Sequence, residues 1–247
     1  MRLHDFRVLT FDCYGTLIDW ESGIFAALGP LLVKMPAPIG RDSALEAFAR
    51  HESAQEAETP RMRYSELLAK VHRRLAAEWG IAADEEAAQR FGASVPEWPA
   101  FADSATALAA LKEHYQLVIL SNVDRASFAG SNRRLGVVFD AVFTAEDIGS
   151  YKPDPGNFRY LLERLAERGV RKEDILHTAQ SLFHDHVPAK RAGLASAWID
   201  RRHGAASFGA TMPPPEDARY DFRFPSLAAM VEAYREEERD TVPHGAG

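Results

Sequence analysis

Residues 6–12 read FRVLTFD and run directly into CYGT at residues 13–16. A short apolar run that ends in an acid and is followed by glycine is typical of a buried parallel strand with a tight turn at its carboxyl end. In open parallel sheets, ligands bind at that end of the strands. We therefore expect Asp12 to stand at the functional edge of a sheet.

Beyond about residue 100 the chain alternates between helical and strand patterns. Strand patterns occur at residues 116–122 (QLVILSN), 140–148 (DAVFTAEDI), 174–181 (DILHTAQS), 196–200 (SAWID) and 220–224 (YDFRF). Helical spacing of apolar residues separates them and follows the last one. This alternation predicts an α/β fold, a Rossmann-like doubly wound parallel sheet with helices on both faces.

The stretch from residue 19 to residue 96 has a different character. It is rich in Ala, Leu, Glu and Arg with helical spacing, it contains no strand pattern, and prolines divide it into several helices. We predict a core domain made of residues 1–18 and 97–240, with a helical domain at 19–96 inserted into it. Residues 241–247 are expected to be a disordered tail.

The bulk composition limits the function classes. With 29 basic and 36 acidic residues the net charge is −7, so a nucleic-acid partner is not expected. The single cysteine, Cys13, forms no internal disulfide, which fits a reducing compartment. No apolar run approaches the roughly 20 residues of a membrane helix, and the first residues lack a signal-peptide core. We expect a cytoplasmic protein with no membrane partner.

Polar side chains stand at the carboxyl ends of four predicted strands or in the loops that follow. They are Asp12, Tyr14, Thr16, Ser121, Asn122, Lys152, Gln180, Ser181 and Asp185. Each alone has an ordinary structural explanation as a turn, a helix cap or a first-turn acid. Because parallel strands bring their carboxyl ends to one edge, the group together predicts an active site.

These residues resemble the four motifs of the haloacid dehalogenase (HAD) superfamily: DCYGT at 12–16, SN at 121–122, Lys152 before a proline, and Asp185 after a strand. The resemblance covers nearly the whole chain, and the helical insertion is similar to the cap domain of that superfamily. It implies that Asp12 is a covalent nucleophile. It also implies that Ser121 and Asn122 bind the reacting group and that Lys152 balances the charge of Asp12.

Two positions distinguish between branches of the superfamily. Its phosphatases carry a second Asp two residues after the nucleophile and an acidic Mg²⁺ ligand after the fourth strand; here these positions are Tyr14 and Gln180. A phenol is a poor substitute for a carboxylic acid as proton donor, and a neutral amide is a poor ligand for a hard cation. The chain resembles instead the L-2-haloacid dehalogenases, which carry DxYGT and need no metal. No cofactor is therefore expected, with Mg²⁺ required only if the chain is a phosphatase.

The resemblance implies hydrolysis of an (S)-2-haloacid to a 2-hydroxyacid. Asp12, oriented by Thr16, would displace the halide and form an ester, which water would then hydrolyse. Asp185 is the first candidate for activating that water, and His184 could share the role; the alternative is that His184 and His186 are ordinary helix-surface residues. The residues expected around the substrate are Tyr14, Ser121, Asn122, Arg50, Gln180, Ser181 and His184.

The chain departs from the dehalogenases at several of their positions. The Ser and Asn of the fourth motif correspond to Gln180 and Leu182, and a Tyr six residues beyond the motif lysine corresponds to Phe158. Dehalogenases bind the leaving halide with an Arg from the first helices of the cap. Arg50 is our first choice for that residue, followed by Arg41 and Arg63.

Three other functions remain open on the sequence alone. The same attack by Asp12 could open a strained ring beside a carboxylate, the protein could be a Mg²⁺-dependent phosphatase, or it could be a non-catalytic binding protein on the same fold. The expected ligand is a small molecule, most simply a short carboxylic acid. The resemblance also makes a homodimer plausible.

Overall fold

The computed structural model describes residues 1–205, 207, 209–216 and 218–241. The tail predicted at 241–247 lies outside this part of the chain except for Thr241, the last residue of helix α10 (Leu227–Thr241). None of the helices in the described part of the chain combines the length and the apolar composition that crossing a membrane requires.

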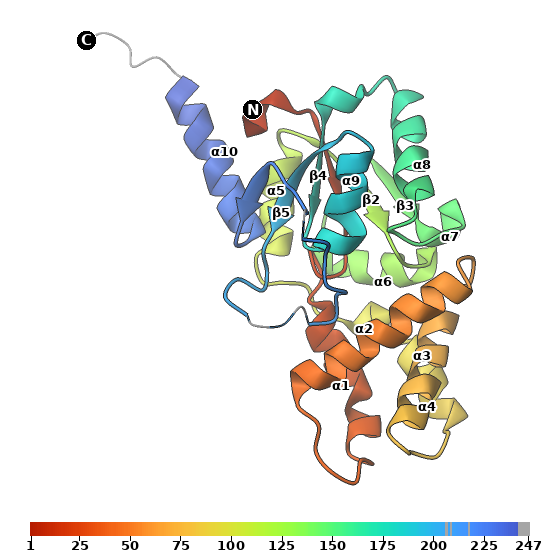
Figure 1. Cartoon of the computed structure of the whole chain (residues 1–247). Coiled ribbons are helices and arrows are strands. Elements are labelled where there is room, and N and C mark those ends of the chain that lie inside the picture. Colours follow the sequence, from red (N-terminus) through yellow and green to blue (C-terminus); the bar gives the residue numbers. More distant parts are fainter. Residues whose placement is uncertain (206, 208, 217, 242–247) are drawn as a thin grey trace.

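A six-stranded sheet forms the centre of the molecule, and all of its strand pairs are parallel (Figure 1). Its strand order is β3-β2-β1-β4-β5-β6. The strands are β1 (Val8–Phe11), β2 (Gln116–Ser121), β3 (Ala141–Thr144), β4 (Ile175–Ala179), β5 (Ala195–Ile199) and β6 (Phe222–Phe224). The predicted α/β fold with a doubly wound parallel sheet is confirmed.

One predicted strand is too long. The pattern at 140–148 divides into β3 and the short helix α7 (Ala145–Ile148). Thr144 ends the strand because its hydroxyl accepts from the Asp147 N–H, while the Asp147 carboxylate accepts from the Thr144 N–H. Such a reciprocal pair satisfies backbone donors at a helix start, so it favours a helix over a longer strand.

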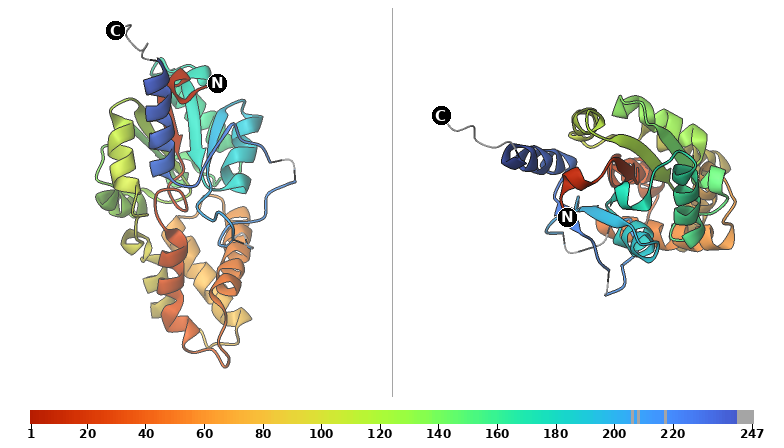
Figure 2. Two further views of the ribbon diagram at one scale, coloured as in Figure 1. Left: turned by 90° about the vertical axis from the view of Figure 1, so that its left-hand side faces the viewer. Right: turned by 90° about the horizontal axis from the view of Figure 1, so that it is seen from above.

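Helices cover both faces of the sheet (Figure 2). Leu9 and Phe11 of β1 belong to a large apolar cluster that includes residues of α5 (Ser104–Lys112), α6 (Arg125–Leu135) and α10. Val8 belongs to a second cluster with residues of α8 (Pro155–Ala166) and α9 (Val187–Arg191). Every residue of β1 and β4 is buried, as expected for central strands of a sheet that is covered on both faces.

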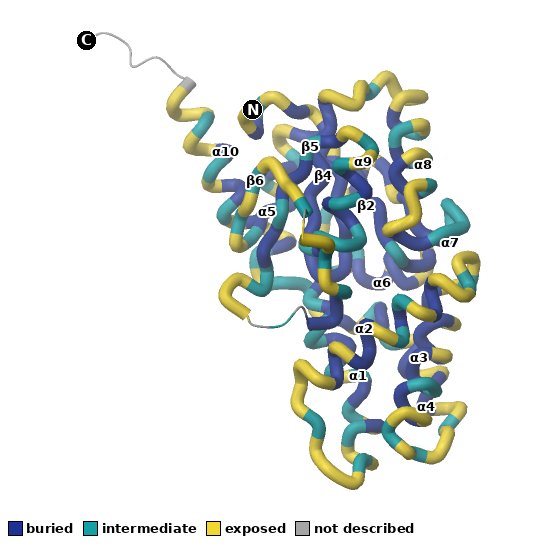
Figure 3. The backbone as a smooth tube through the Cα atoms, viewed as in Figure 1, coloured by how far each residue is buried: buried dark blue, intermediate teal, exposed yellow. Residues whose placement is uncertain are grey.

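Four helices follow β1 and lie beyond the carboxyl ends of the strands (Figure 1). They are α1 (Trp20–Leu32), α2 (Arg41–Glu58), α3 (Tyr64–Glu78) and α4 (Glu85–Gly92). Figure 3 shows buried residues where these helices pack together, as well as in the sheet. Pro36, Pro38 and Pro60 lie between the helices, as predicted, whereas Pro30 lies inside the last turn of α1. The division into two domains remains a prediction.

The functional edge of the sheet is set by its topology. From β1 the sheet continues through β2 and β3 on one side and through β4, β5 and β6 on the other. Ligands of open α/β sheets bind at such a switch point, outside the carboxyl ends of the strands. The Asp12 N–H donates to the Thr178 carbonyl over 3.1 Å, which joins the end of β1 to β4 at this point.

We expect Gly23→Ala to destabilise the protein by about 1–3 kcal/mol, because a methyl group there overpacks a full site. A Cβ at Gly23, on α1, would lie 2.3 Å from Cγ of Trp98, a side chain only 1% exposed. Urea unfolding measures the change. A Cβ at Gly29, on the same helix, meets no atom outside its chain neighbours and its own helix, so the control Gly29→Ala should leave stability unchanged or raise it by up to about 1 kcal/mol through the higher helix propensity of Ala. Equal midpoints for the two variants would contradict the packing of α1 on Trp98.

Candidate active site

A cavity lies at the carboxyl ends of the central strands, between the sheet and the inserted helices. Its lining on the sheet side is Asp12, Tyr14, Asn122, Lys152, Ser181, His184 and Asp185. Trp20, Glu52, Glu56 and Tyr64 line it from the insertion, and Thr211 from the loop after β5. Most of the predicted site residues are thus brought together, which follows from the parallel strand arrangement.

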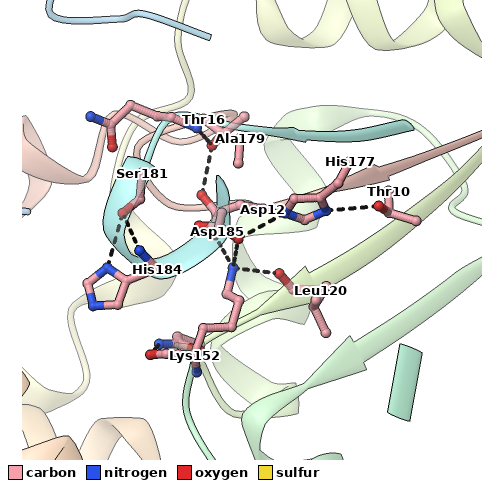
Figure 4. Close-up of polar contacts among 12 residues, drawn as sticks. Thr10, Asp12, Thr16, Leu120, Lys152, His177, Ala179, Ser181, His184 and Asp185 are labelled. Atoms are coloured by element: carbon pink, nitrogen blue, oxygen red, sulfur yellow. Dashed lines mark hydrogen bonds and ion pairs between the residues drawn. The ribbon is translucent and has the colours of Figure 1, made fainter. Parts of the chain in front are cut away.

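Lys152 connects two carboxylates at the floor of the cavity (Figure 4). Its Nζ donates to Asp12 Oδ1 over 2.9 Å, to Asp185 Oδ1 over 2.6 Å and to the Leu120 carbonyl over 2.9 Å. Lys152 and Asp185 are each 1% exposed, and Asp12 is 6% exposed. All three donors of the ammonium group are therefore used, and its position relative to both carboxylates is fixed.

The second oxygen of Asp12 is held by Thr16. The Thr16 hydroxyl donates to Asp12 Oδ2 over 2.7 Å and accepts from the Gln180 N–H over 2.9 Å. The intervening Gly15 has φ +92°, and a Cβ there would meet Trp20 and Gln180 at 3.0–3.1 Å. Glycine is needed at this turn because L side chains rarely adopt that conformation.

His177 completes the surroundings of Asp185 and was not identified from the sequence. Its Nε2 lies 3.0 Å from Asp185 Oδ1, and its Nδ1 lies 2.9 Å from the hydroxyl of Thr10, its neighbour across β1 and β4. A carboxylate oxygen only accepts, so Nε2 carries a proton. Asp185 Oδ2 is buried and has no hydrogen-bond partner in the described part of the chain, so it is free to accept from a ligand or a water.

Burial and charge act in opposite directions on the three groups. Burial raises the pKa of Asp12, and the Lys152 charge opposes that rise without cancelling it. Burial also opposes ionisation of Asp185, but Lys152 and His177 outweigh it and lower the pKa of that carboxyl. The ammonium of Lys152 is desolvated too, yet the two carboxylates raise its pKa. Lys152 thus acts on Asp12 in the expected direction, but it stabilises the ionised form of Asp185 more fully.

The helix-surface alternative for His184 and His186 is wrong. Both lie in η4 (Leu182–His186), a π-helical turn of a kind often found at functional sites. His186 is fully buried, between Ser196 Oγ at 3.0 Å and the Ala179 carbonyl at 2.9 Å. His184 lines the cavity with Nδ1 3.2 Å from Ser181 Oγ, and burial lowers its pKa to about 4. His184 is therefore neutral at pH 7.

Asn122 holds the backbone of Lys152. Its Nδ2 donates to the Lys152 carbonyl over 2.9 Å, and its Oδ1 accepts from the Lys152 N–H over 2.7 Å. Nδ2 also donates to Glu56 Oε1 over 3.1 Å, which links the sheet edge to α2. Ser121 is 2% exposed, its Oγ has no partner among the described residues, and it does not line the cavity. The position of Ser121 gives no support to the substrate-binding role expected for it.

Tyr14 and Gln180 occupy the two positions that distinguish the branches of the superfamily. The Tyr14 ring lines the cavity, but its hydroxyl pairs with Ser131 Oγ at 2.9 Å. Gln180 does not line this cavity; its side chain accepts from the Thr211 hydroxyl and lines two other cavities, and its contact with substrate stays a prediction. Among the described residues, no group of three or more His, Cys, Asp or Glu side chains is arranged to hold a metal ion. That the reaction needs no metal stays a prediction.

The three arginine candidates all lie outside the cavity, which corrects the expectation for Arg50. The Arg50 guanidinium pairs with Glu78 at 2.9 Å, and its side chain is 56% exposed. Arg41 donates to Ser22, and Arg63 pairs with Glu146. None of these side chains lines the cavity.

In place of an arginine, α2 contributes two glutamates to the cavity, which sequence reasoning missed. Glu52 and Glu56 are one helical turn apart and therefore share a face. Glu52 Oε1 accepts from the Tyr64 hydroxyl over 2.5 Å. The two acids continue the buried stripe that begins with Leu45 and Phe48. Charged residues on an otherwise apolar stripe are unusual, and that pattern could have drawn attention to them.

Comparison with known proteins places the chain in a family. The family model described as haloacid dehalogenase-like hydrolase matches residues 6–178. An (S)-2-haloacid dehalogenase of Pseudomonas putida is 26% identical over 208 residues, covering 80% of this chain and 86% of that protein.

Solved structures extend the comparison to the fold. The L-2-haloacid dehalogenase of Xanthobacter autotrophicus matches with a TM-score of 0.76 at 20% identity, covering 93% of this chain and 98% of that one. The HAD-hydrolase YfnB of Bacillus subtilis, bound to magnesium, matches with a TM-score of 0.74 at 20% identity, covering 95% and 100%. At these identities the structural likeness shows the fold alone. The family match, however, spans more than half of the sequence, and the chain therefore belongs to the haloacid dehalogenase-like hydrolases.

Proposed function

We propose that the protein hydrolyses a bond at a carbon centre through an ester on Asp12, and that hydrolytic dehalogenation of an (S)-2-haloacid is the reaction to measure first. The observation that carries the proposal is the buried Asp12 carboxylate held between Lys152 and Thr16, at 2.9 and 2.7 Å. The similarity to an (S)-2-haloacid dehalogenase supports halide as the leaving group. Tyr14 supports it too, because a departing halide needs no acid at that position.

In the first step, one oxygen of Asp12 attacks C2 of the substrate from the side opposite the halogen. The carbon–halogen bond breaks, the halide leaves with the electron pair, and an ester joins Asp12 to the inverted carbon. Lys152 and Thr16 keep the carboxylate in a single orientation, so that little rearrangement is needed when the substrate arrives.

In the second step, water adds to the carbonyl carbon of the ester, and one of its protons passes to the Asp185 carboxylate or the His184 imidazole while the other ends on the hydroxyl of the departing product. The 2-hydroxyacid departs, and Asp12 regains its carboxylate with one oxygen from the water. Asp185 Oδ2 and His184 Nε2 are both buried and without a partner in the described part of the chain, and both residues line the cavity. Either atom could accept the hydrogen bond that orients the water, so both remain candidates for this role.

The nucleophile is tested by turnover of (S)-2-chloropropionate in ¹⁸O-labelled water containing EDTA. We expect ¹⁸O in the peptide that contains Asp12, because water attacks the enzyme's own carbonyl carbon. Asp12→Asn should lower halide release by at least about a thousandfold. Asp42→Asn, which changes an exposed carboxyl on α2, is the matched control and should retain activity. Turnover that leaves the enzyme unlabelled, or that EDTA abolishes, would contradict the proposal.

The rate of ester formation should fall with decreasing pH as Asp12 is protonated. The midpoint of this fall should lie at a higher pH than the pKa of a free aspartate. Only the ionised Asp12 attacks, and burial raises its pKa above 3.8. Lys152→Met removes a charge that favours ionisation, so the acidic limb should move up further, by about one pH unit or more. Single-turnover mass spectrometry across pH measures it. The control Lys190→Met removes a lysine from a surface ion pair with Asp221 and should leave the acidic limb of the pH profile in place. If Lys152→Met also left the limb in place, Lys152 would not set the pKa of Asp12.

A further inference from the structure

The wall of the cavity opposite Asp12 is acidic and aromatic. Glu52 and Glu56 are only 5% and 7% exposed, although both carry a carboxyl group. One oxygen of each accepts a hydrogen bond, from Tyr64 and from Asn122. The other oxygen of each makes no hydrogen bond within the described part of the chain. Each glutamate therefore keeps one oxygen free for a ligand, and that oxygen is an acceptor once the carboxyl is ionised.

The charge around the cavity does not favour an anion. Lys152 is the one cationic side chain among the described residues that line it, and Asp12 and Asp185 already share that charge. His184 is neutral because burial lowers its pKa to about 4. The lining therefore carries a net charge of about −1 even when both glutamates are protonated. A simple haloacid anion would meet no unpaired cation here.

We propose that Glu52, Glu56, Tyr64 and Trp20 form a subsite for a protonated amino group, so that the substrate attacked by Asp12 carries a cationic nitrogen. An ammonium group supplies three donors and no acceptor, which matches carboxylate oxygens. Aromatic rings attract cations, and those of Trp20 and Tyr64 line the same wall. The buried, unpartnered Asp185 Oδ2 is an independent sign that the cavity is built for a polar ligand. The inference rests on the proposed role of Asp12.

The protonation state of the glutamates gives the subsite a second measurable property. Burial raises the pKa of Glu52 to about 8 and raises that of Glu56 well above its usual range. Tyr64, Tyr151 and Lys152 face the pair, while Asp12, His184 and Asp185 lie across the cavity. An ammonium group binds the ionised carboxyl more tightly than the neutral one. At pH 7 its binding should therefore release protons, and its affinity should rise with pH through about 8, where Glu52 ionises.

Calorimetric titration with n-butylammonium, butyrate and 1-butanol tests the subsite without any reaction. We expect butylammonium to bind most tightly, with proton release seen as a dependence of the heat on the buffer. Glu52→Gln and Glu56→Gln keep the side-chain shape and should each weaken that binding by about tenfold or more. Glu58→Gln, on the exposed face of the same helix, should leave it unchanged. Tighter binding of butyrate, or unchanged binding in both cavity variants, would overturn the inference.

A reaction experiment separates this inference from the proposed function. Halide release from 6-amino-2-chlorohexanoate is compared with release from 2-chlorohexanoate, which lacks only the amino group. We expect kcat/KM to be at least about tenfold higher for 6-amino-2-chlorohexanoate than for 2-chlorohexanoate. This preference should disappear in Glu52→Gln and in Glu56→Gln. Equal turnover of both acids with ¹⁸O entering Asp12 would retain the nucleophile and reject the ammonium subsite. Binding that depends on the amino group, without ¹⁸O entering Asp12, would retain the ammonium subsite and reject Asp12 as the nucleophile.

Discussion

The buried ammonium group of Lys152 is the constraint on which the site depends. A charge removed from water is costly unless it is paired and hydrogen-bonded, and Lys152 is 1% exposed. Its three acceptors come from the turn after β1, the backbone of β2 and η4. These segments are distant in sequence and meet because β1 pairs with β2 on one side and β4 on the other. The sheet order is therefore what makes a buried cation possible at this edge.

Further hydrogen bonds hold Lys152 and its partner Asp185 in place. The Asn122 amide fixes the backbone of Lys152, and His177 fixes the Asp185 carboxylate while its other nitrogen contacts Thr10. As a result the carboxyl groups of Asp12 and Asp185 differ in their pKa values although they share one lysine. Asp185 is stabilised as an anion, whereas burial keeps Asp12 easier to protonate. Two carboxylates with separated pKa values can take separate parts in a reaction.

The sheet side of the site could be predicted from the sequence because parallel strands place their carboxyl ends together. Asp12, Lys152 and Asp185 follow apolar runs and so had to meet at one edge. The contribution of the insertion could not be predicted in the same way. Which face of α2 points at the cavity depends on how the inserted helices pack, so Arg50 was selected from the sequence and Glu52 was missed. His184 and His186 were uncertain because a π-helical turn changes the spacing at which side chains share a face.

The hydrogen bond from Asn122 to Glu56 joins the sheet edge to the insertion, and it has a thermodynamic consequence. The pKa of Glu56 is high because its carboxyl is buried, and so desolvated, between the sheet edge and the insertion. If α2 moved away from the sheet, water would reach Glu56 and its pKa would fall toward that of an ordinary glutamate. Separation of the two parts would then release a proton near neutral pH, and acid would favour the joined arrangement. The pH of the solution would thus act on the shape of the molecule as well as on its chemistry.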